Sequence, residues 1–198
     1  MAVVGVRGIG RAVDPPDEGD ALLIRRIAHG DRQALTDLYL RHRQALFHYL
    51  LQFTSDDGVA EELLQDTLVA VWKNARSYKG DARVLAWLFG IARRRACKRL
   101  RRRELPQADL AELETVPAED PEPEAALLAS VTRAEIAAAL AQLAPQHREA
   151  LLLAFVHELS YAEIAAVLEV PLGTVKSRLN HAKRSLRAVL RAGEEAEQ

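Results

Sequence analysis

Apolar side chains recur every three or four residues along most of this 198-residue chain. Leu35, Leu38, His42, Leu46 and Tyr49 follow this spacing in one stretch, and Leu64 and Leu68 follow it in another. Such spacing places apolar side chains on one face of an α-helix, whereas a half-buried strand would alternate with a period of two. Because no stretch alternates convincingly, the pattern predicts an all-α protein.

The first part of the chain, residues 21–103, is predicted to consist of helices throughout. One helix is expected from about Val59 to Ala75, with polar side chains opposite its apolar stripe. The stretch SYKGDAR, residues 77–83, interrupts the helical pattern with Gly and Asp, which favour loops. A further helix is expected to begin near Val84 and to continue into a strongly basic segment.

Two blocks of opposite charge follow one another in the middle of the chain, although its net charge is only −1. Residues 92–103, ARRRACKRLRRR, contain eight Arg or Lys, and residues 104–124 contain eight acids, four prolines and no base. Eight like charges within about three helical turns repel one another, and phosphate groups would relieve that repulsion. The acidic segment cannot bury enough apolar surface to order itself, so a linker is predicted over residues 104–125.

The helical period returns after the linker and leads to the stretch LSYAEIAAVLEVPLGTVKSRLNHAKRSLR, residues 159–187. Ser160 and Glu163 have the spacing of a capping box at the start of a helix. The segment EVPLG breaks this helix, and a second, basic helix is expected to begin near Thr174. Two short helices joined by a tight turn, with a basic second helix, predict a DNA-binding helix-turn-helix.

Several classes of protein are disfavoured by the composition. The single cysteine, Cys97, excludes an internal disulfide and favours an intracellular setting. No apolar run reaches the length of about 18 residues that a membrane span needs. The six histidines are scattered without metal-ligand spacing, and no phosphate-binding Gly-rich loop or catalytic constellation is present. We therefore expect no enzyme, no catalytic residues, no metal and no cofactor.

Taken in order, these motifs resemble the bacterial RNA polymerase sigma factors of the extracytoplasmic-function (ECF) type. The stretch AEELLQDTLVAVWKNARSYKGDARVLAWLFGIAR is similar to their region 2, and LAPQHREALLLAFVHELSYAEIAAVLEVPLGTVKSRLNHAKRSLR is similar to their region 4. The resemblance implies two small helical domains joined by a flexible acidic linker. The expected boundaries are 1–20 for a disordered extension, 21–103 for region 2, 104–125 for the linker, 126–191 for region 4 and 192–198 for an acidic tail.

The resemblance also implies a cytoplasmic sigma factor that binds core RNA polymerase, recognises the −10 and −35 promoter elements and melts DNA. Its implied partners are the β′ clamp helices and β flap of the polymerase, promoter DNA and an anti-sigma factor. The residues matched to core binding are Glu62, Gln65 and Asp66. Those matched to the −10 element and melting are Lys79, Asp81, Arg83, Trp87, Arg94, Lys98 and Arg101. Those matched to the −35 element are Thr174, Lys176, Ser177, Arg178, Asn180, His181, Lys183 and Arg184. Lys176 and His181 are expected on the exposed side of the recognition helix.

Two positions depart from the pattern of that family. Arg94 follows IAR where the family commonly has Asn, which leaves the −10 base preference open. Glu169 stands at a turn where Gly is common, so this turn is expected to be strained or differently shaped. Trp87 is equally consistent with a base-stacking residue and with a core residue.

Two other functions remain open from the residues alone. A stand-alone helix-turn-helix regulator would use the N-terminal helices for dimerisation or ligand binding, and it would bind a palindrome without polymerase. A helical adaptor that sequesters a polymerase or sigma subunit is disfavoured by the basic helix at 174–187.

Overall fold

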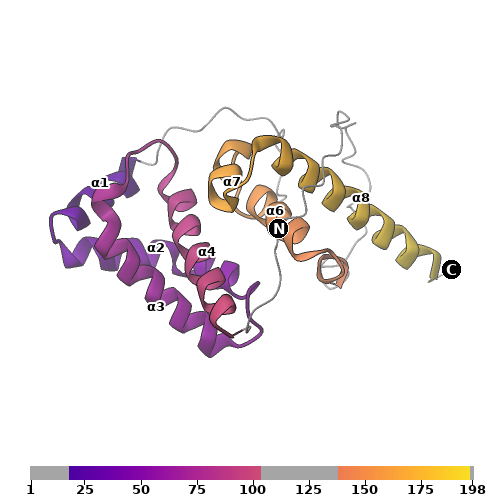
Figure 1. Cartoon of the computed structure of the whole chain (residues 1–198), viewed down its shortest axis with the longest axis horizontal. Helices are drawn as coiled ribbons and strands as arrows, with labels where there is room; N and C mark the ends of the chain where they lie inside the picture. Colours follow the sequence, from indigo (N-terminus) through magenta and orange to yellow (C-terminus); the bar gives the residue numbers. More distant parts are fainter. Residues whose placement is uncertain (1–17, 104–137, 197–198) are drawn as a thin grey trace, which may run out of the picture. The chain divides into compact units, whose positions relative to one another are not determined.

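The computed structural model describes residues 18–103 and 138–196, and the side chains of 102–103 and 190–196 are outside the description. The acidic linker, most of the N-terminal extension and the end of the acidic tail therefore lie outside the described residues. The described residues form helices and no strands, which confirms the predicted all-α class (Figure 1). None of these helices is both long and apolar enough to cross a bilayer.

The helices before the linker begin and end close to the predicted positions. They are α1 (Glu18–Ala28), α2 (Arg32–Leu50), α3 (Asp57–Asn74) and α4 (Val84–Arg103), with a short 3₁₀ helix, η1 (Ala75–Ser77), after α3. Asp31 and Asp56 start α2 and α3 as N-caps, accepting hydrogen bonds of 3.1 Å from the backbone N–H of Ala34 and Val59. The Ala34 N–H and, next, Arg26 lower the pKa of Asp31, because both favour its charged form.

A compact core joins α1–α4. Leu38, Leu46 and Leu64 are buried there, as the apolar period predicts. The ring of Tyr49 lies against that of Phe89, with centroids 4.8 Å apart, so α2 and α4 contact each other through an aromatic pair. The segment Ala162–Glu169 belongs to the same compact unit as these helices.

The start of α1 differs from the expectation that residues 1–20 form a disordered extension. The helix begins at Glu18, and Asp20 is only 2% exposed. The Asp20 carboxylate accepts hydrogen bonds from Arg41 and from His42, the latter at 2.5 Å to Nε2. These two partners on α2 satisfy the buried charge and tie α1 to the core, which the segment DPPDEGD taken alone could not reveal.

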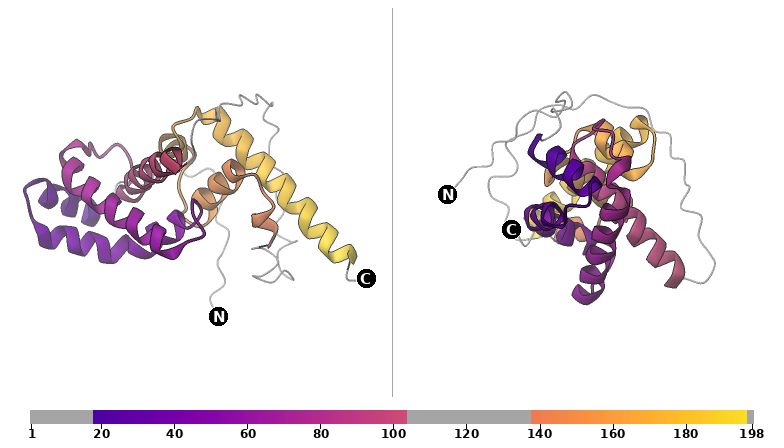
Figure 2. Two further views of the ribbon diagram at one scale, coloured as in Figure 1. Left: turned by 60° about the horizontal axis from the view of Figure 1, so that its bottom comes forward. Right: turned by 90° about the vertical axis from the view of Figure 1, so that its left-hand side faces the viewer.

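After the linker the helices are α6 (Pro145–Phe155), α7 (Tyr161–Leu168) and α8 (Leu172–Ala196). Pro145 occupies the first turn of α6, where its missing N–H is not needed. Leu143, Leu151 and Ala182 form a small core between α6 and α8, with Leu140 and Leu186 packed against it. Figure 2 shows α8 extending well beyond α6, so part of the predicted acidic tail is helical up to Ala196.

The turn between α7 and α8 has the backbone that the sequence led us to expect. Glu169 adopts a left-handed conformation with φ of 57°, where a residue other than Gly is strained. The helix bounds therefore fit the predicted helix-turn-helix, with its second helix beginning two residues before Thr174.

Candidate nucleic-acid interface

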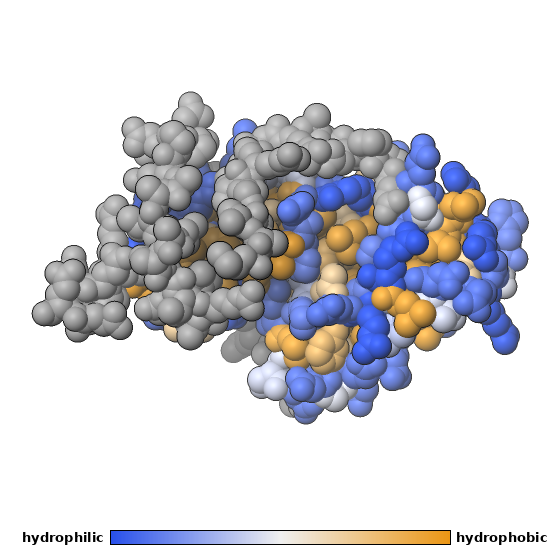
Figure 3. Space-filling view, turned by 180° about the vertical axis from the view of Figure 1, so that it is seen from behind, coloured by the Kyte–Doolittle hydropathy of each residue, from blue (hydrophilic) through white to orange (hydrophobic). Residues whose placement is uncertain are grey.

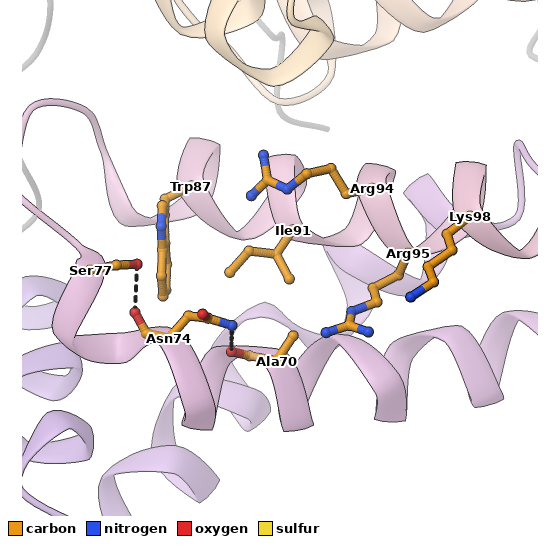
Figure 4. Close-up of a pocket in the computed structure, with 8 residues that line it drawn as sticks. All are labelled: Ala70, Asn74, Ser77, Trp87, Ile91, Arg94, Arg95 and Lys98. Carbon is orange, nitrogen blue, oxygen red and sulfur yellow. Dashed lines mark hydrogen bonds between the residues drawn. The ribbon is translucent and has the colours of Figure 1, made fainter.

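A pocket of about 330 Å³ opens between α3 and α4 (Figure 4). The α3 side and the turn after it contribute Ala70, Asn74 and Ser77. The α4 side contributes Trp87, Ile91, Arg94, Arg95 and Lys98. The pocket thus combines an aromatic ring, an apolar floor and three basic side chains, which are the components of a site for an unpaired nucleotide.

Trp87 forms one end of this pocket rather than part of the closed core. It is partly exposed, and its ring lies beside that of Tyr78 with centroids 5.4 Å apart. Figure 4 shows the indole standing at the Asn74 and Ser77 end of the pocket. This placement favours the stacking alternative over the core alternative, because one face of the pocket is lined by the ring.

The loop between η1 and α4 has a defined shape. The Tyr78 hydroxyl donates a hydrogen bond of 2.6 Å to the carbonyl of Ala82, across the loop. Burial raises the pKa of Tyr78, and the nearby Asp20, Asp81 and Glu163 carboxylates raise it further. Gly80 has φ of 82°, which permits the turn. Lys79 and Asp81 are exposed on this loop.

The basic side of the pocket comes from the middle of α4. Arg94 and Lys98 are exposed and Arg95 is partly exposed, and Figure 4 shows Arg95 and Lys98 at the end away from Trp87. Arg101 is exposed one turn further along, outside the lining. Arg95 was not singled out from the sequence, because a run of arginines does not reveal which members face α3.

Two of the expected −10 residues already have carboxylate partners in the same unit. Arg83 donates from Nε to Glu163 Oε1 at 2.9 Å, from Nη2 to Oε2 at 3.1 Å and from its backbone N–H to Oε1 at 3.2 Å. Glu163 is only 3% exposed, so this pair is largely removed from water. The capping box predicted from Ser160 and Glu163 at the start of α7 stays a prediction.

Arg94 makes a second contact of this kind, at the surface. Its Nη1 lies 3.1 Å from Oε1 of Glu169. These are the two positions at which the chain departs from the family pattern, and the structure pairs them. Arg94 remains exposed beside the pocket, so this ion pair does not close it.

The expected polymerase-binding residues lie together on α3. Glu62, Gln65 and Asp66 are all exposed, and Val69, which the sequence analysis did not single out, continues their stripe one turn later with 52% exposure. An ion pair of 2.6 Å joins Glu62 Oε2 to Arg99 Nη1 on α4. Figure 3 shows that apolar side chains reach the surface of the protein in small patches between polar ones.

The recognition helix α8 separates its residues into two faces. Val175, Leu179 and Ala182 are buried, whereas Lys176 and Arg184 are exposed. The remaining expected −35 residues are partly exposed: Thr174, Ser177, Arg178, Asn180, His181 and Lys183.

Within this second group, His181 and Lys183 turn toward α6. The His181 ring stacks on that of His147, with centroids 5.5 Å apart and planes 8° from parallel, and its buried Nε2 has no hydrogen-bond partner among the described residues. The expectation that His181 lies on the exposed side is therefore wrong. The Lys183 ammonium lies 5.6 Å from the centroid of the Phe155 ring. Burial, and secondly Arg187, lower the pKa of Lys183.

Comparisons with known proteins place both halves of the chain in one family. Residues 38–105 match Sigma-70 region 2, and residues 133–186 match Sigma-70, region 4. The chain is 32% identical over 176 residues to the ECF RNA polymerase sigma factor SigK of Mycolicibacterium vanbaalenii, covering 87% of this chain and 89% of SigK.

Two solved structures have a similar fold. One is CnrH in complex with the cytosolic domain of CnrY, with a TM-score of 0.62 and 25% identity, covering 88% of this chain and 98% of that one. The other is the sigma factor RpoE in complex with the anti-sigma factor NepR from Bartonella quintana. Its TM-score is 0.59 and its identity 29%, and the match covers 79% of this chain and 96% of that one.

Proposed function

This chain belongs to the ECF RNA polymerase sigma factors of the sigma-70 family, and from that membership we propose how its surfaces divide the work of initiation. As a sigma factor it binds core RNA polymerase and directs promoter recognition and transcription initiation. A stand-alone helix-turn-helix regulator is not favoured, because such a regulator would not need a sigma-70 region 2. We assign the protein no enzymatic activity and place it in the cytoplasm with the polymerase.

The α3 stripe of Glu62, Gln65, Asp66 and Val69 is the proposed contact with the β′ clamp helices. Three polar side chains and one exposed apolar side chain on a single helix face suit a helix-to-helix interface. Glu62 is held by Arg99, so Gln65 and Asp66 are the members of the stripe available to a partner.

The pocket between α3 and α4 is the proposed site for the unpaired strand of the −10 element, and it is the observation that carries the functional proposal. A base would stack on Trp87, while Arg95 and Lys98 at the other end would bind the strand's phosphates. Stacking requires a base that has left the duplex, so this site favours the melted promoter over the closed one.

The exposed side of α8 is the proposed reader of the −35 element. Lys176 near the start of this helix is placed to reach base edges in the major groove, and Arg184 further along is placed to bind phosphate. His181 and Lys183 are proposed to hold α8 on α6 rather than to read bases.

An anti-sigma factor and the β flap remain proposed partners. CnrH and RpoE were each solved with a bound protein, which for RpoE is the anti-sigma factor NepR. The acidic segment at 104–125 is proposed to occupy a channel of the polymerase that is lined for nucleic acid, because a polyanionic peptide is complementary to a basic channel.

Run-off transcription tests this assignment. Core polymerase should initiate from members of a promoter library when this protein is added and should not do so without it. Binding of the free protein to a palindromic site, with no effect on initiation by core polymerase, would instead support the stand-alone regulator.

A further inference from the structure

Asn74 lies in the α3–α4 pocket, and nothing in its sequence position suggested a role. It is the last residue of α3 and directly precedes η1. An Asn before a helix commonly caps it by accepting a hydrogen bond from a following backbone N–H. Here the side chain makes no such bond to η1 and instead donates from Nδ2 to the carbonyl of Ala70 at 2.8 Å. The residue therefore serves neither the usual capping function nor the core.

The Ala70 contact decides which way the amide faces. A carbonyl oxygen can only accept, so the group beside it must be the NH₂ of Asn74 and not its oxygen. The amide oxygen Oδ1 then points away from Ala70, and no hydrogen bond among the described residues uses it. The Ser77 hydroxyl donates a hydrogen bond of 2.7 Å to the backbone carbonyl of Asn74 and not to its side chain. The Asn74 side chain therefore presents Oδ1 as an acceptor.

The surroundings of Asn74 define what would approach this acceptor. Figure 4 shows its side chain beneath Ile91 and beside the Trp87 ring, with Arg95 and Lys98 at the opposite end of the pocket. A nucleotide with its phosphate at the basic end and its base at the Trp87 end would bring a base edge to Asn74. At that edge an acceptor meets an amino group favourably and a carbonyl oxygen unfavourably.

We propose that Asn74 is a specificity-determining residue whose Oδ1 accepts a hydrogen bond from the exocyclic amino group of an unpaired promoter base. Thymine, which presents carbonyl oxygens and no amino group, is then disfavoured at that position. The proposal rests on the pocket being the −10 strand site. Cytosine and thymine form the sharpest comparison, because both are pyrimidines and position 4 carries an amino donor in cytosine and a carbonyl acceptor in thymine, although they differ also at N3 and at the C5-methyl group.

Forked promoter DNA with an unpaired −10 strand tests the proposal, using holoenzyme assembled from core polymerase and the full chain. Each position of the strand carries cytosine or thymine in turn, and the dissociation constant is measured. Wild-type holoenzyme should prefer cytosine at one position by about two- to tenfold, the worth of one hydrogen bond. Asn74→Ala should bring the two bases to near equality at that position and leave the other positions unchanged.

Two further variants separate the amide oxygen from the rest of the site. Gln33→Ala is the matched control, since it removes an exposed amide on α2 that does not line the pocket, and it should keep the preference. Asn74→Asp keeps acceptor oxygens but replaces the Nδ2 donor with an oxygen that the Ala70 carbonyl repels. It therefore retains the acceptor without the contact that orients it, and it should keep only part of the preference. An unchanged preference in Asn74→Ala overturns the proposal, as does a stronger preference for cytosine in Asn74→Ala than in Asn74→Asp.

Failure of this inference can be distinguished from failure of the proposed function. If wild-type holoenzyme binds the forked strand and Asn74→Ala leaves every base ratio unchanged, the pocket stands as a strand site and Asn74 is not its selector. If wild-type holoenzyme gains nothing from the unpaired strand, the strand site itself is wrong. Thermal unfolding of each variant checks the fold, which should be preserved because Asn74 is exposed.

Discussion

The α3–α4 surface and the α8 surface both present basic side chains, but they present them on different shapes. On α3–α4 the basic side chains line the α4 side of a pocket with an aromatic end, and on α8 they lie along the outer side of one helix. A pocket can enclose a base that has left the stack, whereas a helix can enter the major groove and read bases that remain paired. The two surfaces are therefore suited to two states of the same DNA.

Breaking the attachment to polymerase should have the largest effect, because we propose that both surfaces contact promoter DNA only when the protein is bound to core polymerase. Asp66→Arg reverses an exposed charge in the middle of the α3 stripe and should abolish co-purification with core polymerase. Glu18→Arg, an equal charge reversal at an exposed position of α1, should co-purify normally. Recovery of folded Asp66→Arg with core polymerase at the wild-type yield would remove the stripe from the proposed interface.

Removing the aromatic end of the pocket should affect melted DNA selectively. Base stacking on an aromatic side chain is worth about 1–3 kcal/mol, so Trp87→Ala should weaken binding to a pre-melted promoter by about five- to 150-fold. Trp87→Phe keeps a ring and should lose much less. Binding to a duplex carrying only the −35 element should not change, and an equal loss on both DNAs would indicate a general folding defect.

The salt dependence of binding separates phosphate contacts from a solvated helix end. Each phosphate neutralised on a single strand adds about 0.7 to the slope of log affinity against log salt concentration. Replacing Arg95, Lys98 and Arg101 with Gln should therefore lower that slope by about two. Gln is a good helix former, so α4 should persist. Equal slopes for wild type and the triple variant, measured by filter binding, would mean that this segment does not bind DNA.

The most localised effects are expected on α8, where Lys176 and His181 have different proposed roles. Lys176→Ala should relax the preference at one −35 base pair, by about 1–3 kcal/mol if the contact is good. His181→Ala should leave all base preferences intact and instead lower the unfolding free energy by about 1 kcal/mol, because it removes the stack on His147. A base-specific effect of His181→Ala, measured on a library of −35 variants, would restore it to the reading surface.

The helical period predicted most of this fold, because α2, α3 and α4 each bury one face against the others. The family and function were also predicted from the motifs and were confirmed by the comparisons. The start of α1 was missed because Asp20 looks like a solvent-exposed acid until Arg41 and His42, far along the chain, are brought to it.

The details of the candidate sites depended on helix phase. Asn74 and Arg95 acquire their positions from how α3 and α4 pack, which spacing within one helix does not specify. His181 was placed on the wrong side of α8 for the same reason, since α6 determines which residues of α8 are covered. The residue types at a site were thus predictable, but which of several adjacent residues face it was not.

Arg83 pairs with Glu163, and Arg94 pairs with Glu169. In each pair the anion beside the arginine is a carboxylate of the protein itself. A DNA phosphate that binds either arginine must replace a carboxylate as well as dissolved ions. The exchange of one anion for another releases fewer salt ions than the neutralisation of a bare cation, so these two arginines should contribute less to the salt slope than Arg95 or Lys98. Counting arginines in the sequence would therefore overstate how strongly promoter binding responds to ionic strength.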